Sequence, residues 1–535
     1  MKYYRVNQIK LNIGENKGNL PSRIERKLGL KAGALAGCEW EIRRESIDAR
    51  EKKNIKLVYT VDFETEEAEL ISVLDRLVSA GKLTAVDRQA EKPFELNPGC
   101  EAMNGRPIIV GFGPCGIFAG LELARAGYRP LIVERGASME ERASDVAKFR
   151  TLRVLDPESN MLFGEGGAGT FSDGKLTSGI KDGNIRKVLE IFCGAGAGED
   201  IMYLHRPHIG TDVLRDVIVN LRKQIIDLGG EIRFNTRLDS MNVKSGRIES
   251  VEIVTEESRE TISTNSVILA IGHSARDTFE LIKDEGIKIQ PKPFSIGVRM
   301  EHPQAMIDQS QYGDEDRLPP ADYKVSYHAG NGRGVYSFCM CPGGEVVTCS
   351  TAEGELCVNG MSNRQRDSGV ANSGILCDVR IEDFGADDEL AGVRFQQKYE
   401  KLAYENGMKQ AQIAGDPVAE FSAPHTTMKD FLDMNNNAMP VIASLPEYAS
   451  EAIREAVPFF ARKIKGYDRP DAIVTAVETR SSSPIRILRG EDGQCNVEGI
   501  YPAGEGAGYA GGITSAACDG IRAAQAIIAR FAKPE

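Results

Sequence analysis

Apolar and polar positions repeat with two different periods along this chain, and the order of those periods predicts its organisation. In the first hundred residues the pattern switches between alternation, typical of strands, and helical spacing. The segments in chain order are Tyr4–Ile13 (strand), Leu20–Leu30 (helix), Cys38–Ile47 and Ile55–Phe63 (strands) and Glu66–Ala80 (helix). This order predicts a small two-layer α+β domain over residues 1–100. Proline and glycine in residues 89–104 predict a linker after it.

In a second pattern, short apolar runs alternate with amphipathic segments. This pattern covers residues 104–289 and returns near the C-terminus. The apolar runs predict buried strands, and the amphipathic segments predict helices that cover their sheet. The predicted strands are Ile108–Val110, Leu131–Val133, Glu231–Phe234, Gly246–Thr255, Val267–Ile271, Ile473–Val477 and Gly499–Tyr501; the predicted helices are the segment ending at Ala126, Ser138–Arg150, Thr211–Leu228 and Ile513–Phe531. We therefore expect an α/β, Rossmann-type domain built from residues 104–289 and 471–535.

Residues 290–470 have a different pattern, in which short predicted strands are separated by proline and glycine turns. The predicted strands are Ser295–Glu301, Tyr323–Tyr327, Gly334–Cys339 and Glu345–Ser350, and helices are predicted at about 388–406 and 450–464. This pattern predicts an α+β domain inserted into the Rossmann-type domain.

Three glycines follow the first strand of the Rossmann-type pattern in G-x-G-x-x-G spacing, at Gly111, Gly113 and Gly116. The first allows a tight turn, the second leaves room for a pyrophosphate, and the third lets the next helix pack closely on the strand. Glu134, at the end of the second strand, is placed to accept hydrogen bonds from a ribose, which argues against NADP and leaves FAD or NAD. The neighbouring residues assigned to the same site are Pro114, Cys115 and Arg135.

Residues 162–179, LFGEGGAGTFSDGKLTSG, form a second glycine-rich segment, too rich in glycine for a helix or a central strand. Its backbone N–H groups are suited to an anion nest or to the close approach of a flat ring. Gly167 and Thr170 are assigned to cofactor contacts, and Lys175 would place a positive charge beside a reduced flavin. The alternative interpretation is a flexible surface loop.

Two further motifs favour structural interpretations. The run CGAGAG at 193–198 follows a helical segment rather than a strand, so it is interpreted as a helix C-terminus and not as a phosphate loop. Cys339 and Cys341 stand two apart on a predicted strand. A redox-active pair is one hypothesis, but a disulfide between them would be strained, which favours buried apolar residues.

Composition narrows the function classes. The chain has 66 Lys and Arg against 78 Asp and Glu, and its net charge of −12 does not suggest a nucleic-acid binder. No apolar run of about 18 residues predicts a membrane span, and the N-terminus has no signal-peptide core. Eleven scattered cysteines fit a cytoplasmic protein. With six histidines and no C-x-x-C or H-E-x-x-H pattern, we expect no metal site.

Basic residues outnumber acidic ones up to residue 60. This excess indicates either a docking face for an acidic partner or RNA, or a solvated surface, which is the favoured interpretation. A protein partner that docks through the N-terminal domain stays a hypothesis.

Together these features resemble the two-dinucleotide-fold flavoproteins. The matching signatures, in chain order, are the glycine motif with Glu134, the turn at Thr236–Leu238, the apolar strand that runs into Gly272, and a late glycine motif at 501–512. The resemblance implies that the backbone at Leu238 holds the adenine. It also implies that Gly272 and His273 lie close to the cofactor.

The late motif, YPAGEGAGYAGG, departs from the usual pattern of these flavoproteins, which reads G-D. Here it is Gly504-Glu505, so the carboxylate that usually holds the flavin ribityl chain or pyrophosphate is one methylene longer. Gly512 and Ile513 begin a helix whose N-terminus is expected to face a second polar part of the same cofactor.

More closely, the strings GEGGAGTFSDGKLTSG, PHIGTDVLR, AIGHSARDTFE, FCMCPGGEVV and YPAGEGAGYAGGITSA resemble a bacterial family of uncharacterised FAD-dependent dehydrogenases. In that family an N-terminal α/β domain precedes the FAD domain, and a family-specific domain is inserted. The resemblance implies FAD and brings no established substrate. No His or Cys stands in a recognisable flavin-attachment motif, so the FAD is expected to be non-covalent.

The expected activity is that of an FAD-dependent oxidoreductase that transfers a hydride between flavin and a small, anionic organic substrate. Lys175 is expected beside the flavin, Arg299 is expected to bind a substrate carboxylate, and His302 to deliver a proton. An ion pair with Glu301 at a domain interface is the alternative for the last two. His273 is either a cofactor contact or a structural histidine.

Two other functions stay open: a flavin monooxygenase, and a non-enzymatic FAD-bound redox sensor or scaffold. No second G-x-G-x-x-G follows a strand. NADH or NADPH, if used as reductant, would therefore enter the substrate cleft only transiently.

Overall fold

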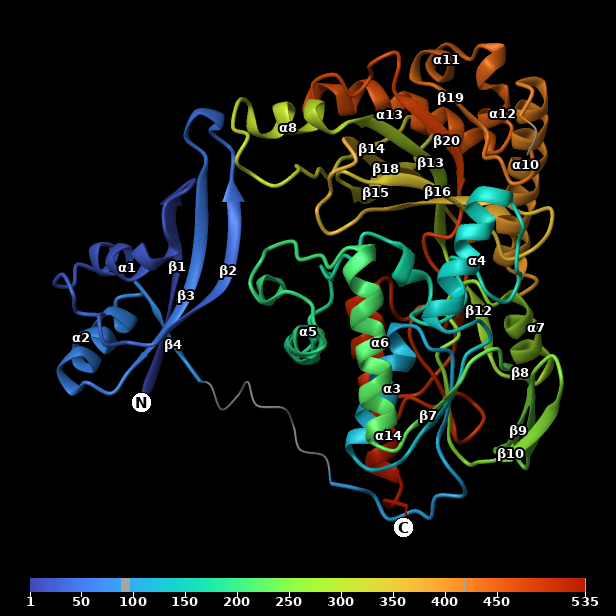
Figure 1. Cartoon of the computed structure of the whole chain (residues 1–535), viewed down its shortest axis with the longest axis horizontal. Helices are drawn as coiled ribbons and strands as arrows, with labels where there is room; N and C mark the ends of the chain where they lie inside the picture. The colour runs from blue at the N-terminus through green and yellow to red at the C-terminus, as the bar shows by residue number, and fades with distance from the viewer. Residues whose placement is uncertain (88–96, 417–418, 535) are drawn as a thin grey trace.

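The computed structural model describes residues 1–87, 97–416 and 419–534 (Figure 1). Most of the predicted linker, residues 89–96, lies outside the described part. The remainder of that prediction, 97–104, runs along the C-terminal end of the chain, where Glu101 forms a bridge with Phe531. No helix in the described residues is long and apolar enough to span a membrane.

The N-terminal sheet has the order β2-β3-β1-β4 and packs against two helices. Its elements are β1 (Lys2–Asn12), α1 (Leu20–Leu28), β2 (Trp40–Asp48), β3 (Lys56–Thr65), α2 (Ala68–Ser79) and β4 (Thr84–Val86). Alternate residues of β1, including Tyr4 and Val6, are fully buried against Leu20 and Leu74 of the helices. The β-α-β-β-α order predicted from the sequence is confirmed, with β4 as an additional short strand.

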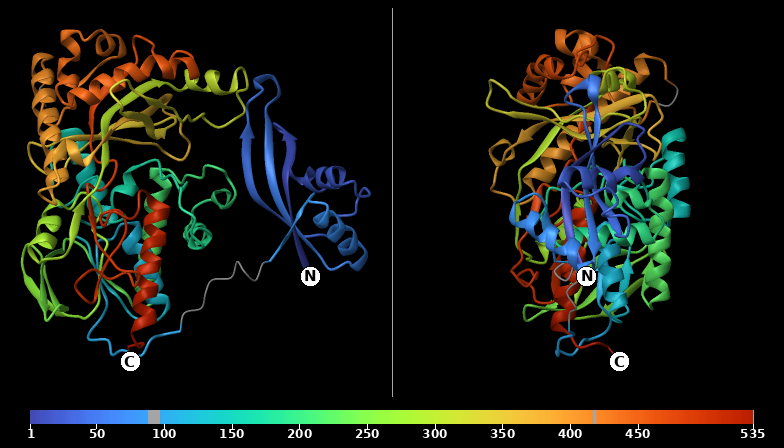
Figure 2. Two further views of the ribbon diagram at one scale, coloured as in Figure 1. Left: turned by 180° about the vertical axis from the view of Figure 1, so that it is seen from behind. Right: turned by 90° about the vertical axis from the view of Figure 1, so that its left-hand side faces the viewer.

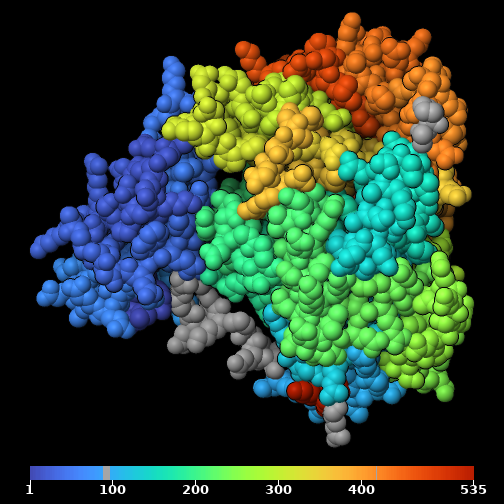
Figure 3. All heavy atoms as spheres, viewed as in Figure 1, coloured from blue at the N-terminus to red at the C-terminus, as the bar shows by residue number. Residues whose placement is uncertain are grey.

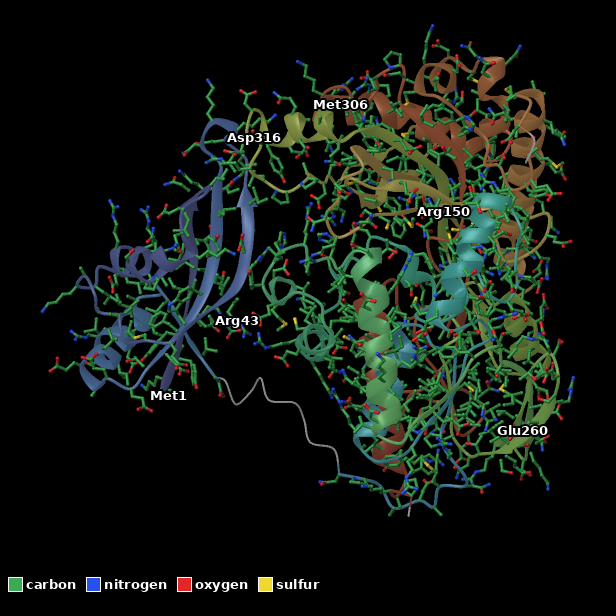
Figure 4. All side chains as sticks on the ribbon, viewed as in Figure 1. Met1, Arg43, Arg150, Glu260, Met306 and Asp316 are labelled. Carbon is green, nitrogen blue, oxygen red and sulfur yellow. The ribbon has the colours of Figure 1, made fainter. Side chains whose placement is uncertain are left out.

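The edge strand of this sheet contacts the rest of the molecule. The Glu45 amide on β2 donates to the Tyr203 carbonyl (2.7 Å), and the His205 amide donates to the Glu45 carbonyl (2.8 Å). Lys52 donates to the Ser310 carbonyl (2.6 Å), and Figure 4 shows the labelled Asp316 beside the same end of the sheet. Two views confirm that the N-terminal sheet stands at one side of the body (Figure 2).

The dinucleotide sheet is parallel, with the strand order β22-β11-β5-β6-β7. Its strands are β5 (Ile108–Val110), β6 (Leu131–Val133), β7 (Glu231–Arg233), β11 (Val267–Leu269) and β22 (Ile500–Pro502). The helices α3 (Pro114–Arg125), α6 (Thr211–Asp227) and α14 (Ile513–Arg530) stand together on one face (Figure 1). The opposite face is covered by the meander β8 (Arg237–Lys244), β9 (Arg247–Val254) and β10 (Arg259–Ser263). The predicted Rossmann-type α/β fold is present.

Two glycines allow the close packing of α3. A Cβ at Gly116 would lie 1.9 Å from the Gly111 carbonyl oxygen, so only glycine lets α3 approach β5. A Cβ at Gly520 on α14 would lie 2.1 Å from the Cys115 carbonyl oxygen, so α14 can cross α3 only at a glycine. The third position of the sequence motif therefore has the packing role that the spacing predicts.

The second sheet is antiparallel, with the order β14-β15-β18-β13-β20-β19. Its strands are β13 (Phe294–Pro303), β14 (Ser326–His328), β15 (Gly334–Cys341), β18 (Val370–Val379), β19 (His425–Thr427) and β20 (Ile473–Glu478), with the hairpin β16 (Glu345–Cys349) and β17 (Cys357–Met361) beside it. The helices of this part are α8 (Gln304–Tyr312), α9 (Ile381–Phe384), α10 (Ala391–Ile413), α11 (Met428–Asp433), α12 (Met439–Ile442) and α13 (Glu447–Lys463). The face of the sheet under α13 forms its apolar core.

One predicted boundary is wrong. Residues 473–477 were expected to return to the Rossmann-type domain, but β20 pairs with β13 and β19 in the second sheet. The two sheets are instead joined by the pair β12 (Ile289–Pro291) and β21 (Ile485–Ile487). An apolar run of six residues fits either sheet, so the pattern alone does not distinguish them.

The remaining helices lie around the dinucleotide sheet. They are α4 (Met139–Leu152), α5 (Asn184–Gly194) and α7 (Arg276–Asp284). The CGAGAG run begins with the last two residues of α5, Cys193 and Gly194, and continues as its C-terminal turn, as predicted, with Gly196 at φ +110°. In the space-filling view the segment after α5 meets the N-terminal sheet (Figure 3).

Candidate functional site

A cavity begins at the carboxyl ends of the dinucleotide strands and continues to the wall formed by β15, β17 and β20 of the second sheet. Residues assigned from the sequence that line it are Gly111, Gly113, Pro114, Cys115, Glu134, Arg135, Gly167, Lys175, Leu238, Gly272, His273, Glu505, Gly512 and Ile513. Ligands of doubly wound sheets bind at this edge. The sequence motifs thus converge on one cavity although they are far apart along the chain.

Two helices begin at this cavity. The N-cap residues are Gly113 for α3 and Gly512 for α14, and neither makes a side-chain capping hydrogen bond. The first N–H groups of a helix lack intrahelical partners, and the positive end of the helix dipole favours an anion there. Both helix N-termini are therefore suited to the pyrophosphate of a dinucleotide.

Glu134 connects three backbone segments at the first end of the cavity. Its side chain is buried, 5% exposed, and accepts hydrogen bonds from the amides of Phe112 (2.8 Å), Gly136 (3.0 Å) and Gly164 (2.9 Å). An ionised carboxylate has about four acceptor sites. One therefore remains for a ribose hydroxyl, while the other three fix the glycine turn and the glycine-rich loop.

Arg135 beside it is neutralised by protein carboxylates. It forms ion pairs with Glu158 (2.7 Å) and Asp277 (2.8 Å), and its guanidinium lies 4.3 Å from the centre of the Phe163 ring. Arg135 thus forms a wall of the cavity rather than a free anion-binding group.

The glycine-rich loop is held from behind by Arg142, a residue that the sequence analysis did not single out. Arg142 is fully buried and donates to the carbonyls of Asn160 (2.8 Å), Glu165 (2.5 Å) and Gly167 (3.0 Å). A Cβ at Gly164 would lie 2.5 Å from the Arg142 side chain. The loop is therefore a rigid part of the cavity and not a flexible surface loop.

Lys175 lies at the second end of the cavity with 31% of its side chain exposed. It forms an ion pair with Asp173 (2.8 Å), and Arg366 binds the same carboxylate (2.6 Å). Burial alone would lower the pKa of Lys175, but Cys341 and Asp173 raise it overall, so the ammonium is retained. Two cations against one carboxylate leave a net positive charge.

Two other titratable groups that line the cavity have pKa values shifted by burial. The pKa of His273 falls to about 4 through burial and the charges of Arg480 and Arg276, so its ring is neutral at pH 7. The pKa of Glu505 rises to about 7, mainly through burial, with Lys292 opposing the shift. Groups whose pKa is close to the working pH are suited to holding and releasing protons.

Arg299 does not line the cavity, so the expectation that it binds a substrate carboxylate is wrong. It is 0% exposed and donates to Glu478 (2.9 Å), Asn359 (3.0 Å), Asn372 (3.0 Å) and the Cys339 carbonyl (2.9 Å). Its partner Glu478 does line the cavity, and burial raises the pKa of that carboxyl to about 7 despite the opposing charge of Arg299. Arg299 therefore positions the wall residues from the second sheet.

His302 is also a structural residue rather than a proton donor to the cavity. Its ring is buried, its Nε2 lies 2.7 Å from the Tyr467 carbonyl, and it packs on the Tyr467 ring. The proposed alternative, an ion pair with Glu301, is not found either: Arg299 pairs with Glu478.

Three cofactor assignments need a similar correction. Thr170 is fully buried and donates to the Glu165 carbonyl (3.3 Å), so it braces the loop. Gly116 lies behind the cavity wall against Gly111, and Gly504 packs against Cys115. All three support the cavity without lining it.

The wall contributed by the second sheet was not predicted from the sequence. The residues involved are Phe338, Asn359, Glu478, Arg480 and Ser481. Arg480 is held by Glu400 (2.8 Å), which also binds Arg276 of α7 (2.8 Å), so this ion-pair network joins the two sheets. The strand periodicity contained no signal that distinguishes these residues from an ordinary core.

These features fit a bound FAD. The uncapped helix N-termini would hold the pyrophosphate, Glu134 and the backbone near Leu238 would hold the adenosine, and the end near Lys175 would hold the ring. Gly113 leaves its Cβ position open, since the nearest atom is 3.7 Å away. A dinucleotide can therefore approach the backbone there.

Comparison with known sequences agrees with the geometry. Residues 293–481 match the model of the family described as "FAD-dependent protein, C-terminal domain-like", and residues 3–64 match a domain of unknown function, DUF8436. An uncharacterised protein of Clostridium beijerinckii is 41% identical over 550 residues, which cover 99% of each chain.

The similarity to solved structures is low. The flavin-dependent brominase Bmp2 is 13% identical with a TM-score of 0.37, covering 79% of this chain and 80% of its own. A geranylgeranyl bacteriochlorophyll reductase-like protein of Thermoplasma acidophilum is 14% identical with a TM-score of 0.34, covering 80% and 78%. Similarity this low transfers no substrate or reaction. The chain belongs, with its Clostridium relative, to a family of uncharacterised FAD-dependent flavoproteins.

Proposed function

We propose that this flavoprotein is a dehydrogenase or reductase that transfers a hydride between FAD and a small, anionic organic molecule. The observation that carries the proposal is the continuous cavity. It extends beyond the helix N-termini to a wall from the second sheet, and its lining includes Lys175, Glu478 and Glu505. Sites of this kind, apolar with a few convergent polar groups at a domain interface, are typical of small-molecule binding.

The protein groups at this end have separable roles. FAD, when bound, supplies the hydride chemistry. The net positive charge of Lys175, Arg366 and Asp173 favours negative charge on the reduced ring or on a substrate carboxylate. Glu478 and Glu505, with pKa values of about 7, hold or release the accompanying proton.

A screen under anaerobic conditions tests this proposal. Oxidised holoprotein is mixed with small carboxylates and with their neutral amides, and flavin absorbance is followed. We expect bleaching by members of the carboxylate series. NADH and NADPH are tested as reductants in the same way. A flavin that no compound reduces, although dithionite does, contradicts the proposal.

A redox sensor is a second candidate, and one observation favours it. The N-terminal sheet pairs with Tyr203–His205, and the same segment continues to Pro207 and His208, which bridge to Leu176 and Lys175. A contact of the N-terminal sheet could thus depend on the state of the cavity. Proteolysis of the N-terminal sheet that changes with flavin reduction, together with an inert flavin, would favour the sensor. Rapid reoxidation by oxygen with substrate hydroxylation would favour a monooxygenase.

A further inference from the structure

The strand β15 is distorted where it borders the cavity. Phe338 pairs with Gly374 and Cys341 pairs with Asn372, so Cys339 and Met340 together oppose a single residue of β18. This is a β-bulge, and Cys339 has φ +40°, in the left-handed region that non-glycine residues seldom adopt. Such backbone outliers concentrate at functional sites. The expected strain in a disulfide between Cys339 and Cys341 assumed regular strand alternation. The bulge removes that regular alternation here.

The two thiols differ in access. Cys339 is partly exposed and lines the cavity, whereas Cys341 is 0% exposed beneath it. The Cys341 sulfur lies 3.3 Å from the Cys339 carbonyl oxygen and 3.8 Å from the Lys175 Nζ. An accessible thiol with a buried thiol behind it is the arrangement of an attacking and a resolving cysteine.

The charges around the pair favour a thiolate at the accessible position. The hydrogen bond from Cys341 lowers the pKa of Cys339, and the cations Lys175 and Arg299 act in the same direction, against burial and Asp173. The pKa of Cys341 is raised by the same hydrogen bond and by burial. Glu478 also faces Cys339, and its burial keeps part of that carboxyl protonated near pH 7.

We propose that Cys339 and Cys341 form a redox-active dithiol–disulfide pair, with Cys339 as the attacking thiolate and Cys341 as the resolving thiol. The co-reactant class is a small disulfide, R–S–S–R. The Cys339 thiolate attacks one sulfur and releases R–S⁻. Cys341 then attacks the Cys339 sulfur of the mixed disulfide, and its proton leaves with the second R–S group. The pair loses two electrons, and R–S–S–R is reduced to one thiol and one thiolate.

This inference does not depend on the proposed function, because the exchange needs only the two thiols and a disulfide. A matched control pair lies in the same part of the molecule. Cys349 and Cys357 face each other across β16 and β17, but both are 2% exposed, neither lines the cavity, and burial and Cys349 raise the pKa of Cys357. Cys349 and Cys357 are therefore close in space, but neither is accessible from the cavity.

The chain offers a direct test, because Met340 separates the two cysteines. Holoprotein is incubated with oxidised glutathione, its free thiols are blocked with iodoacetamide, and it is cleaved with cyanogen bromide. Cleavage places Cys339 in the fragment 307–340 and Cys341 in the fragment 341–361. We expect the two fragments to stay linked until a reductant is added. They should separate in Cys341→Ser, with glutathione retained on Cys339, and stay linked in Cys349→Ala.

A second readout counts electrons. After oxidation and removal of glutathione, anaerobic dithionite titration of the wild type should consume two electron pairs, one for flavin and one for the disulfide. Cys339→Ala, which lacks the attacking thiol and so forms neither a mixed nor an internal disulfide, should consume one. The visible flavin spectrum confirms that each variant is folded. Unlinked fragments with one electron pair in the wild type, or linkage that persists in Cys341→Ser, overturns the proposal.

Discussion

Gly374 on β18 stands directly against Glu478 on β20: a Cβ at position 374 would lie 2.5 Å from the Glu478 Oε2. The two residues belong to strands that both flank β13, and Arg299 of β13 pins the Glu478 carboxylate at 2.7 Å. Glycine at this position therefore makes room for a buried carboxylate that reaches the cavity.

The first prediction follows from that contact. Gly374→Ala should lower the free energy of unfolding by about 1–3 kcal/mol, the usual cost of overpacking, because Arg299 prevents Glu478 from moving away. Thermal unfolding measures the effect. Gly334→Ala on β15, whose added Cβ meets its nearest atom at 3.7 Å, is the matched control and should unfold like the wild type. Equal stability of both variants would show that Glu478 is free to move.

The second prediction separates cofactor binding from folding. Gly113 has φ −80° and an open Cβ position, so Gly113→Val should keep its circular dichroism and lose FAD. Gly116→Val should lose both, because its Cβ collides with the Gly111 carbonyl. Gly194→Val at the end of α5, where no atom lies within 4 Å, should retain both. If Gly113→Val still binds FAD normally, the pyrophosphate is placed wrongly.

The third prediction concerns the charge beside the ring. Lys175→Met should lower the flavin reduction potential by about 30 mV, which for a two-electron couple corresponds to about 1.4 kcal/mol. Lys181→Met is the control, since Lys181 is exposed and outside the cavity. Spectroelectrochemical titration measures both. An unchanged potential in Lys175→Met would mean that Asp173 cancels the lysine charge at the ring.

The fourth prediction concerns pH. The pKa of Glu505 is raised by burial to about 7, above the value of about 4.3 for an unfolded glutamate. The native state therefore holds the proton more tightly, and stability should fall as pH rises from about 4.3 through 7. Glu505→Gln should remove part of that slope in urea unfolding, and exposed Glu491→Gln should not. If the free energy of unfolding of Glu505→Gln depends on pH as in the wild type, Glu505 does not have the raised pKa.

The dinucleotide half of the site was predictable because its information is local. Gly111, Gly113 and Glu134 lie within one strand–helix–strand unit, so their spacing alone implies a common edge of the sheet. Lys175 was found for a similar reason, since a glycine-rich segment of that length fits few other structures.

The wall from the second sheet was not predictable in the same way. Arg299 and Glu478 meet only through the pairing of β13 with β20, which joins residues far apart in sequence. β13 is buried on both faces over most of its length, so alternation did not indicate where Arg299 points. β18 was not among the predicted strands. At its centre Asn372 accepts a hydrogen bond from Arg299, and Gly374 leaves room for Glu478.

The position of β22 and α14 has a consequence for synthesis. They are synthesised after every strand of the second sheet, yet β22 pairs with β11 and α14 packs on α3. Translation at about 5–20 residues per second leaves an interval on the order of half a minute to a minute between β5 and β22. During that time the face of α3 that α14 covers has no partner, while the strands of the second sheet are being completed. The second sheet is therefore synthesised in full before the dinucleotide sheet can be completed by β22.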